Sequence, residues 1–217
     1  MSLNILVFLG SVRDSTPPKP ARVGKRVALA CERILNDAGH QVEVIDPLDS
    51  KCPDVFKPAF AYSDKERPEM LQKLQDKIEA ADAYVMVSPE YNHSMSPALA
   101  ELLNHFGSSS FAYRPSSIVT YSAGQWGGVR AAVALRSFLG ELGCLPVSAM
   151  IHVPKASESI DEEGAFKEDS ERWQGYFERS FAQLRWWAEA TIAQREKEDP
   201  HQAAPAFKSS PSQRNAP

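Results

Sequence analysis

The chain has 217 residues, of which 43% are hydrophobic and 24% are charged, and its formal net charge is -4. This length and composition are typical of one globular domain with a substantial core. The weak negative charge without a long basic block argues against a nucleic-acid partner, and no apolar run reaches membrane-spanning length. The three cysteines lie far apart without metal-ligand spacing, so we expect no metal site. Because the apolar opening segment 3–9 has no basic leader, we expect a cytoplasmic protein with reduced thiols.

Strand and helix patterns alternate along the chain. Apolar strand patterns occur at 3–9, 41–46, 83–87 and 116–121, and again within 145–153, where Pro146 breaks the run. Helical periodicity follows each of the first four, and two of these helices are predicted to end at glycine caps, Gly39 and Gly143. This alternation predicts an α/β fold, a doubly wound five-stranded parallel sheet of order 2-1-3-4-5 with helices on both faces.

The end of the chain changes in composition. An amphipathic helix is predicted over 171–194, with roughly one face formed by Trp173, Phe177, Phe181, Leu184, Trp187 and Thr191. Beyond it, proline, alanine, serine, glutamine and charged residues predominate, and such a segment cannot bury much apolar surface. We therefore predict one domain, 1–194, followed by a disordered tail, 195–217.

In the predicted order, the loops after strands one, three and four emerge side by side at the carboxyl edge of the sheet. The first loop offers a glycine turn, hydroxyls, arginines and a helix amino end, at Gly10, Ser11, Arg13, Arg22, Val23 and Gly24. Helix N–H groups and guanidinium groups bind phosphate. Neither a P-loop nor a dinucleotide glycine motif is present, so the pattern predicts a phosphate site of another type.

The other two loops suit a flat ligand. The middle one, 88–97, places Tyr91 where it can lie beside a planar ring, with backbone groups of Glu90 to Asn92 at the polar edge of that ring. The third, 122–128, has three glycines that let the backbone approach a ligand closely. Each loop alone is also compatible with an ordinary connection, but their convergence predicts a mononucleotide site. Because the P-loop lysine and a metal-binding carboxylate cluster are missing, FMN fits better than ATP.

Three stretches in this order resemble the NADPH-dependent FMN reductase family of flavodoxin-like quinone and azo reductases. They are Gly-Ser-x-Arg at 10–13, Ser-Pro-Glu-Tyr-Asn-x-Ser at 88–94 and Ser-x-Gly-x-x-Gly-Gly-x-Arg at 122–130, within a resemblance over about 3–190. The resemblance implies a flavodoxin-like fold, bound FMN, NADPH or NADH as electron donor, and a homodimer or homotetramer. The residues that match cofactor-binding positions of the family are Ser11, Arg13, Arg22, Val23, Gly24, Pro89, Glu90, Tyr91, Asn92, Ser122, Ala123, Gly124, Gly127 and Gly128.

Two features depart from the family pattern. An insert, Thr16–Pro20, lengthens the phosphate loop, and the segment Leu99–Asn104 lacks a lysine and an aspartate that many members carry. The first affects where Ser15 lies, and the second affects the expected subunit contact.

The resulting hypothesis is hydride transfer from NAD(P)H through bound FMN to a quinone, flavin or azo acceptor. The cofactor carries this chemistry, so no side chain is assigned as catalytic. Two other functions stay open at this point: a flavodoxin-like electron carrier, and an interaction protein that senses redox state through the flavin. An α/β domain without flavin is the least specific alternative.

Overall fold

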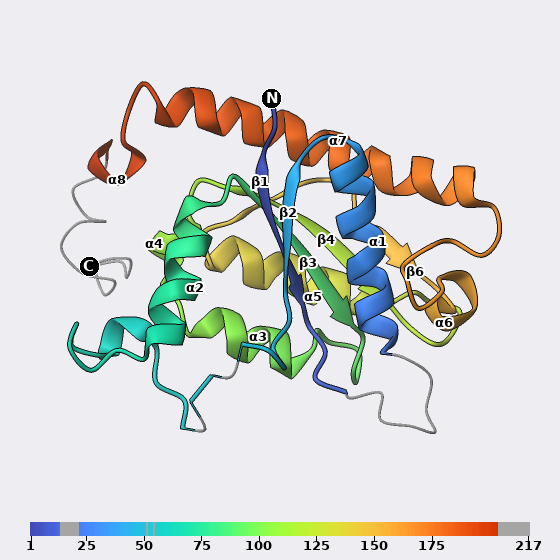
Figure 1. Cartoon of the computed structure of the whole chain (residues 1–217), viewed down its shortest axis with the longest axis horizontal. Coiled ribbons are helices and arrows are strands. Elements are labelled where there is room, and N and C mark those ends of the chain that lie inside the picture. Colours follow the sequence, from blue (N-terminus) through green and yellow to red (C-terminus); the bar gives the residue numbers. More distant parts are fainter. Residues whose placement is uncertain (14–21, 51, 54, 204–217) are drawn as a thin grey trace.

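A single parallel sheet forms the centre of the molecule (Figure 1). The computed structural model describes residues 1–13, 22–50, 52–53 and 55–203. The strands are β1 (Asn4–Leu9), β2 (Gln41–Ile45), β3 (Ala83–Pro89), β4 (Pro115–Tyr121), β5 (Leu145–Pro146) and β6 (Ile151–Val153). They follow the order β2-β1-β3-β4-β5, which confirms the predicted order 2-1-3-4-5. The predicted break near Pro146 is also confirmed, because β5 and β6 both pair with β4 but at different residues.

The two faces of the sheet bury separate apolar clusters. Along β1, Ile5, Val7 and Leu9 face one cluster, whereas Leu6 and Phe8 face the other. This alternation follows from the two-residue period of a strand, and a strand buried on both faces reads as a continuous apolar run. The parallel sheet is thus covered on both sides, as the alternating pattern predicted.

The helices divide between those faces. Their bounds are α1 (Val23–Asp37), η1 (Ala59–Ala61), α2 (Glu69–Ala80), α3 (Pro97–Asn104), α4 (Ser108–Phe111), α5 (Val129–Glu141), α6 (Ala156–Ser159), α7 (Ser170–Arg195) and α8 (Pro200–Ala203). Helices α1, α6 and α7 contribute to the first cluster, and α2, α3, α4 and α5 contribute to the second. None of the helices in the described part of the chain is both long and apolar enough to cross a membrane.

Both predicted glycine caps are confirmed. Gly39 follows α1 with φ 85°, and Gly143 follows α5 with φ 95°. After α1, the N–H of Gly39 donates to Asn36 and that of His40 donates to Leu35, the paired bonds of a Schellman motif. The same two bonds close α5. Glycine fits here because a positive φ has no steric penalty without a Cβ.

The last long helix, α7, packs its aromatic stripe on the sheet with one exception. Phe177, Phe181 and Leu184 are buried as expected, but Trp187, which we expected on the same face, is 39% exposed. Its ring instead packs edge-on against Trp186, with centroids 4.7 Å apart. Of the segment expected to be a disordered tail, Arg195 ends α7 and 200–203 form α8, while residues 204–217 lie outside the described residues.

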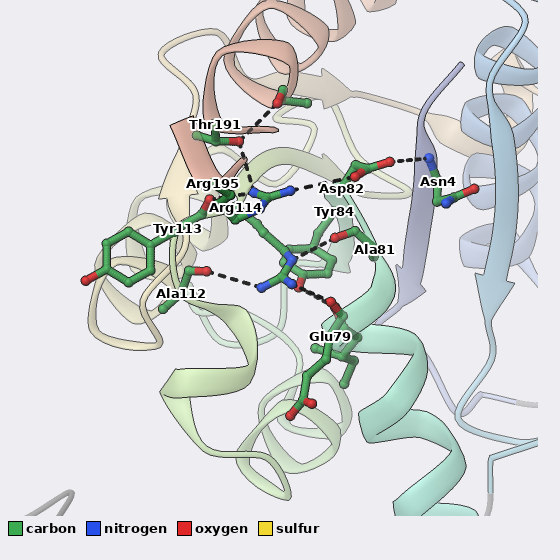
Figure 2. A network of polar contacts seen from close by, with 12 residues as sticks. Asn4, Glu79, Ala81, Asp82, Tyr84, Ala112, Tyr113, Arg114, Thr191 and Arg195 are labelled. Carbon is green, nitrogen blue, oxygen red and sulfur yellow. Dashed lines mark hydrogen bonds and ion pairs between the residues drawn. The ribbon is translucent and has the colours of Figure 1, made fainter. Parts of the chain in front are cut away.

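A polar network closes the amino edge of the sheet (Figure 2). The Arg114 guanidinium donates to the carbonyls of Glu79 and Ala81 at the end of α2, the latter at 2.7 Å. Arg195 pairs with Asp82 at 3.7 Å and donates to the Tyr113 carbonyl at 3.1 Å. Carbonyls at a helix carboxyl end have no partner within the helix and attract cations. The two arginines therefore hold α2, α7 and the start of β4 together.

Candidate functional site

The loop after β1 starts with a close approach to β3. The Gly10 N–H donates to the Val87 carbonyl at 2.7 Å, and a Cβ on Gly10 would lie 2.7 Å from that same oxygen. Only glycine allows this turn without displacing the strand. Ser11 follows as a buried hydroxyl, and its Oγ accepts a hydrogen bond from the Arg13 N–H at 3.3 Å. Residues 14–21, with Ser15 and the insert Thr16–Pro20, lie outside the described residues.

The two arginines that we predicted for this loop have different surroundings. The Arg22 side chain is only 7% exposed: its Nη1 lies 2.6 Å from Asp46 Oδ2 and its Nη2 donates to the Ser11 carbonyl. It therefore ties the loop and the start of α1 to the end of β2. Arg13 is exposed, and among the described residues no carboxylate pairs with it. Of the two guanidinium groups, Arg13 is the one placed to meet a ligand.

Arg13 joins the first loop to the middle loop. Its Cζ lies 4.4 Å from the centroid of the Tyr91 ring, a cation–π distance. The structure thus brings together two residues 78 positions apart, as the predicted convergence of the loops required.

The middle loop is built around a tight turn. Tyr91 and Ser94 exchange two backbone hydrogen bonds of 3.0 Å each, while Asn92 and His93 have φ values of 51° and 62°. Two consecutive positive φ values are the signature of a type I′ turn, which asparagine tolerates well. Beneath the turn, the buried Ser88 Oγ accepts from the Ser96 N–H at 3.0 Å. The turn presents Asn92 and His93 to the outside on a fixed base.

Glu90 connects the middle loop to α5. Its carboxylate accepts hydrogen bonds from the backbone N–H groups of Arg130 (3.0 Å) and Ala131 (3.4 Å) and from the Arg130 Nη1 (3.0 Å). Burial by itself raises the pKa of the Glu90 carboxyl, but the hydrogen bonds from Arg130 and Ala131 outweigh it and hold the pKa below its usual value. The sequence predicts that the backbone of Glu90 contributes to the cofactor site. The structure shows in addition that the Glu90 side chain caps α5.

The third loop folds around Ser122. Its Oγ accepts from the Gly127 N–H at 3.0 Å and donates to the Gly124 carbonyl at 2.8 Å, and the Lys155 N–H donates to the same carbonyl at 2.9 Å. A Cβ on Gly124 would meet no atom within 4 Å. Ala123 and Gly124 thus form an exposed stretch of backbone next to open space, held from behind.

Gly127 and Gly128, which the resemblance assigns to the cofactor site, pack closely against the neighbouring strands. Both are buried and have positive φ values, 61° and 81°. A Cβ on Gly127 would lie 3.0 Å from the Pro154 nitrogen, and one on Gly128 would lie 2.8 Å from the Thr120 Cβ. These glycines let α5 begin close to β4 and β6, and they therefore fix the conformation of the loop on its buried side.

Gly24 and Val23 place the amino end of α1 under the first loop. A Cβ on Gly24 would lie 2.3 Å from the Tyr121 hydroxyl, which is buried at the end of β4. Burial raises the pKa of Tyr121, and a hydrogen bond with the Ser11 side chain opposes that shift. Val23 is half-buried and packs on the core cluster of α1 and α7. Tyr121 thus links β4 to the first loop.

Comparison with known proteins identifies the family. The model of the NADPH-dependent FMN reductase family matches residues 3–158. The chain belongs to this family. An NAD(P)H-dependent FMN reductase of Pseudomonas aeruginosa is 29% identical over 109 residues, which are 48% of this chain and 59% of that protein. An NADPH azoreductase of a Bacillus species is 34% identical over 71 residues, which are 33% of this chain and 40% of that protein. These matches thus span less than two thirds of either relative.

Solved structures support the fold. The flavoenzyme NAD(P)H:(acceptor) oxidoreductase of Paracoccus denitrificans superposes with a TM-score of 0.66 at 19% identity, over 86% of this chain and 98% of that one. An oxidoreductase of Corynebacterium diphtheriae gives a TM-score of 0.62 at 16% identity, over 87% and 98% of the two chains. The predicted resemblance to the FMN reductase family and the flavodoxin-like fold are both confirmed.

The residues at the candidate site are compatible with bound FMN. An exposed arginine in the loop that precedes α1 suits a phosphate, and the exposed backbone at Gly124, in the loop after β4, next to β3 in the sheet, leaves room for a flat ring. Within the described part of the chain, no group of three or more histidine, cysteine, aspartate or glutamate side chains is arranged to hold a metal.

Three residues that organise the site were not assigned from the sequence. Asp46 holds Arg22, Tyr121 contacts the first loop, and Arg130 holds Glu90. The sequence does carry a signal for Asp46 and Tyr121, because each lies at the carboxyl end of a predicted strand, where ligand sites form in such sheets. Arg130 was part of the quoted motif but received no role.

Proposed function

We propose that this protein is an FMN-dependent NAD(P)H oxidoreductase that reduces a small-molecule acceptor. The observation that carries the proposal is the joining of three loops at one edge of the sheet. Arg13 contacts Tyr91, and Glu90 caps α5 directly after the glycine-rich loop. The family to which the chain belongs, the NADPH-dependent FMN reductases, supports the same assignment.

Each loop has a task in this proposal. Ser11, Arg13 and the amino end of α1 at Val23 and Gly24 hold the phosphate, with Arg22 fixing the loop from behind. Pro89 to Asn92 border the polar edge of the ring, and Ser122 to Gly124 offer backbone groups to it, supported from inside by Gly127 and Gly128. FMN, when bound, supplies the hydride chemistry, and the protein supplies orientation and electrostatics. No side chain acts as a catalytic acid or base.

The donor, acceptor and assembly belong to the same proposal. NADPH or NADH delivers the electrons, and a quinone, a flavin or an azo compound receives them. The protein works in the cytoplasm as a homodimer or homotetramer. The similarity to an azoreductase and to an FMN reductase supports the azo and flavin acceptors in this range.

The test is a spectrum and an assay on the full chain. Protein reconstituted with FMN and freed of excess cofactor is expected to be yellow, to lose its absorbance when NADPH is added without oxygen, and to reduce a quinone on mixing. Protein that binds no added FMN would contradict the proposal. Protein that binds FMN but leaves NADPH unoxidised would instead point to an electron carrier.

A further inference from the structure

Glu90 and Arg130 form an ion pair at the junction of two loops of the proposed site. The Glu90 side chain comes from the loop after β3 and is 12% exposed, and Arg130 starts α5 after the glycine-rich loop. The carboxylate receives three N–H donors, two of them backbone groups of the first turn of α5. A shift of the β3 loop relative to α5 would break all three hydrogen bonds. The pair therefore fixes the spacing of the loops that border the ring site.

The pair also balances charge at this place. The positive charges are the Arg130 guanidinium and the amino end of α5, and the negative charge is the Glu90 carboxylate. Because hydrogen bonds lower the pKa of Glu90, the carboxylate stays ionised at neutral pH. Arg130 is 41% exposed and its Cζ lies 5.8 Å from the centroid of the Trp126 ring, so its charge lies beside the glycine-rich loop.

We propose that Glu90 is a positioning residue for the bound flavin, and that the Glu90–Arg130 pair sets the reduction potential of the flavin by keeping the local charge balanced. This inference rests on the proposed function, since it needs FMN in the site. It goes beyond that function by naming the two side chains that tune the cofactor. Charge close to a flavin ring alters its electronics, and FMN gains negative charge when it is reduced.

The proposal predicts shifts of opposite sign for the two partners. In Glu90→Gln, Arg130 and the amino end of α5 are left without a compensating charge, so reduced FMN is stabilised and the midpoint potential rises. In Arg130→Gln, the Glu90 carboxylate is left uncompensated by a side chain, so the midpoint potential falls. The double variant removes both charges and is expected to return close to the wild-type potential. A purely structural pair would not give opposite signs.

Spacing gives a second, separate readout. The glutamine side chain of Glu90→Gln accepts hydrogen bonds with one neutral oxygen and points an NH₂ group at the other donors of α5. We expect the dissociation constant of FMN to rise about tenfold, because hydrogen bonds to a charged group are the strong ones. Arg130→Gln keeps both backbone bonds to Glu90, so its FMN dissociation constant is expected to change by less than about threefold.

The experiment uses the full chain, stripped of cofactor and titrated with FMN by flavin fluorescence, followed by equilibration of the reconstituted proteins with a reference redox dye. Wild type, Glu90→Gln, Arg130→Gln and the double variant are compared. Lys77→Gln serves as the control, because Lys77 forms an exposed ion pair with Glu43 away from the site. Opposite shifts in the two single variants with recovery in the double variant would support the proposal.

Equal potentials in all variants, or shifts of the same sign, would overturn it while leaving the proposed function intact. A wild-type chain that binds no FMN would instead remove the proposed function. If Glu90→Gln fails to fold, Arg130→Gln still decides the matter, because its side chain is exposed and only a fall in potential agrees with the proposal.

Discussion

The two edges of the sheet use arginine in opposite ways. At the amino edge, Arg114 donates to carbonyls of Glu79 and Ala81, and Arg195 is shared between Asp82 and Tyr113 (Figure 2). Burial together with the nearby Arg114 lowers the pKa of Arg195, and Asp82 opposes that shift. At the carboxyl edge, Arg13 is exposed and its guanidinium lies over the Tyr91 ring.

This difference separates arginines that stabilise the fold from the one that we propose binds the FMN phosphate. An arginine whose donors meet protein carbonyls stabilises the fold and has little left for a ligand. An arginine that stacks on an aromatic ring uses the flat face of its guanidinium group. Its N–H bonds lie in the plane of that group and stay free to bind a phosphate. Arg22 lies at the carboxyl edge but is of the structural kind, because its guanidinium pairs with Asp46 and donates to the Ser11 carbonyl. Four predictions test or sharpen the comparison.

The largest expected effect is at the amino edge. Arg114→Ala leaves carbonyls at the end of α2 without a partner, and we expect the free energy of unfolding to fall by about 3 kcal/mol. Urea unfolding measures this, and titration with FMN is expected to give an unchanged dissociation constant. A loss of FMN affinity as large as the loss of stability would break the distinction between the edges.

Arg13→Ala is expected to show the reverse pattern. A lost charge-assisted hydrogen bond to phosphate costs about 2 kcal/mol, which corresponds to a roughly thirtyfold higher FMN dissociation constant. The unfolding free energy of the cofactor-free protein is expected to change by less than about 0.5 kcal/mol. Arg33→Ala is the matched control, since Arg33 also lies over an aromatic ring, that of Phe166. If both variants bind FMN like wild type, Arg13 is not part of the phosphate site.

The glycine loop divides in the same way within seven residues. Gly128→Ala is expected to lower the unfolding free energy by about 1.5 kcal/mol, because its φ of 81° is left-handed and its Cβ would meet Thr120. Gly124→Ala, next to open space, is expected to leave the cofactor-free stability unchanged within about 0.5 kcal/mol and to weaken FMN binding several-fold. Thermal unfolding without FMN and fluorescence titration separate the two. Equal destabilisation by both would mean that Gly124 is also a packing residue.

The smallest effect is a dependence on pH at both edges. Burial lowers the pKa of His152, whose Nδ1 is 2.8 Å from Thr120 Oγ1, and burial together with Arg185 and the terminal amine lowers that of His40. The unfolded chain therefore takes up these protons first, and the folded protein loses stability as the pH falls below about 6.5. His152→Gln and His40→Gln are each expected to show a smaller loss than wild type between pH 7.5 and 5.5 in urea unfolding. An identical loss in a variant would mean that its histidine keeps its ordinary pKa.

Much of the fold was predictable because its signals are local. Continuous apolar runs marked strands buried on both faces, and Gly39 and Gly143 marked helix ends, since a positive φ favours glycine whatever surrounds it. Trp187 was placed wrongly, because its position on the helix left open whether the sheet or Trp186 would cover it.

The candidate site was predictable in its loops and not in its contacts. Strand order alone brings three loops to one edge, so the sequence predicts that Arg13, Tyr91 and Ser122 lie at that edge. Only the tertiary structure decided that Asp46 pairs with Arg22 and that Glu90 caps α5. It also decided that Gly128 packs against Thr120 while Gly124 faces open space. The physical reason is that such pairings join residues far apart in the chain. The sequence does not tell whether the partner of an arginine or a glutamate is another protein group or a ligand, because the fold decides which groups lie next to it.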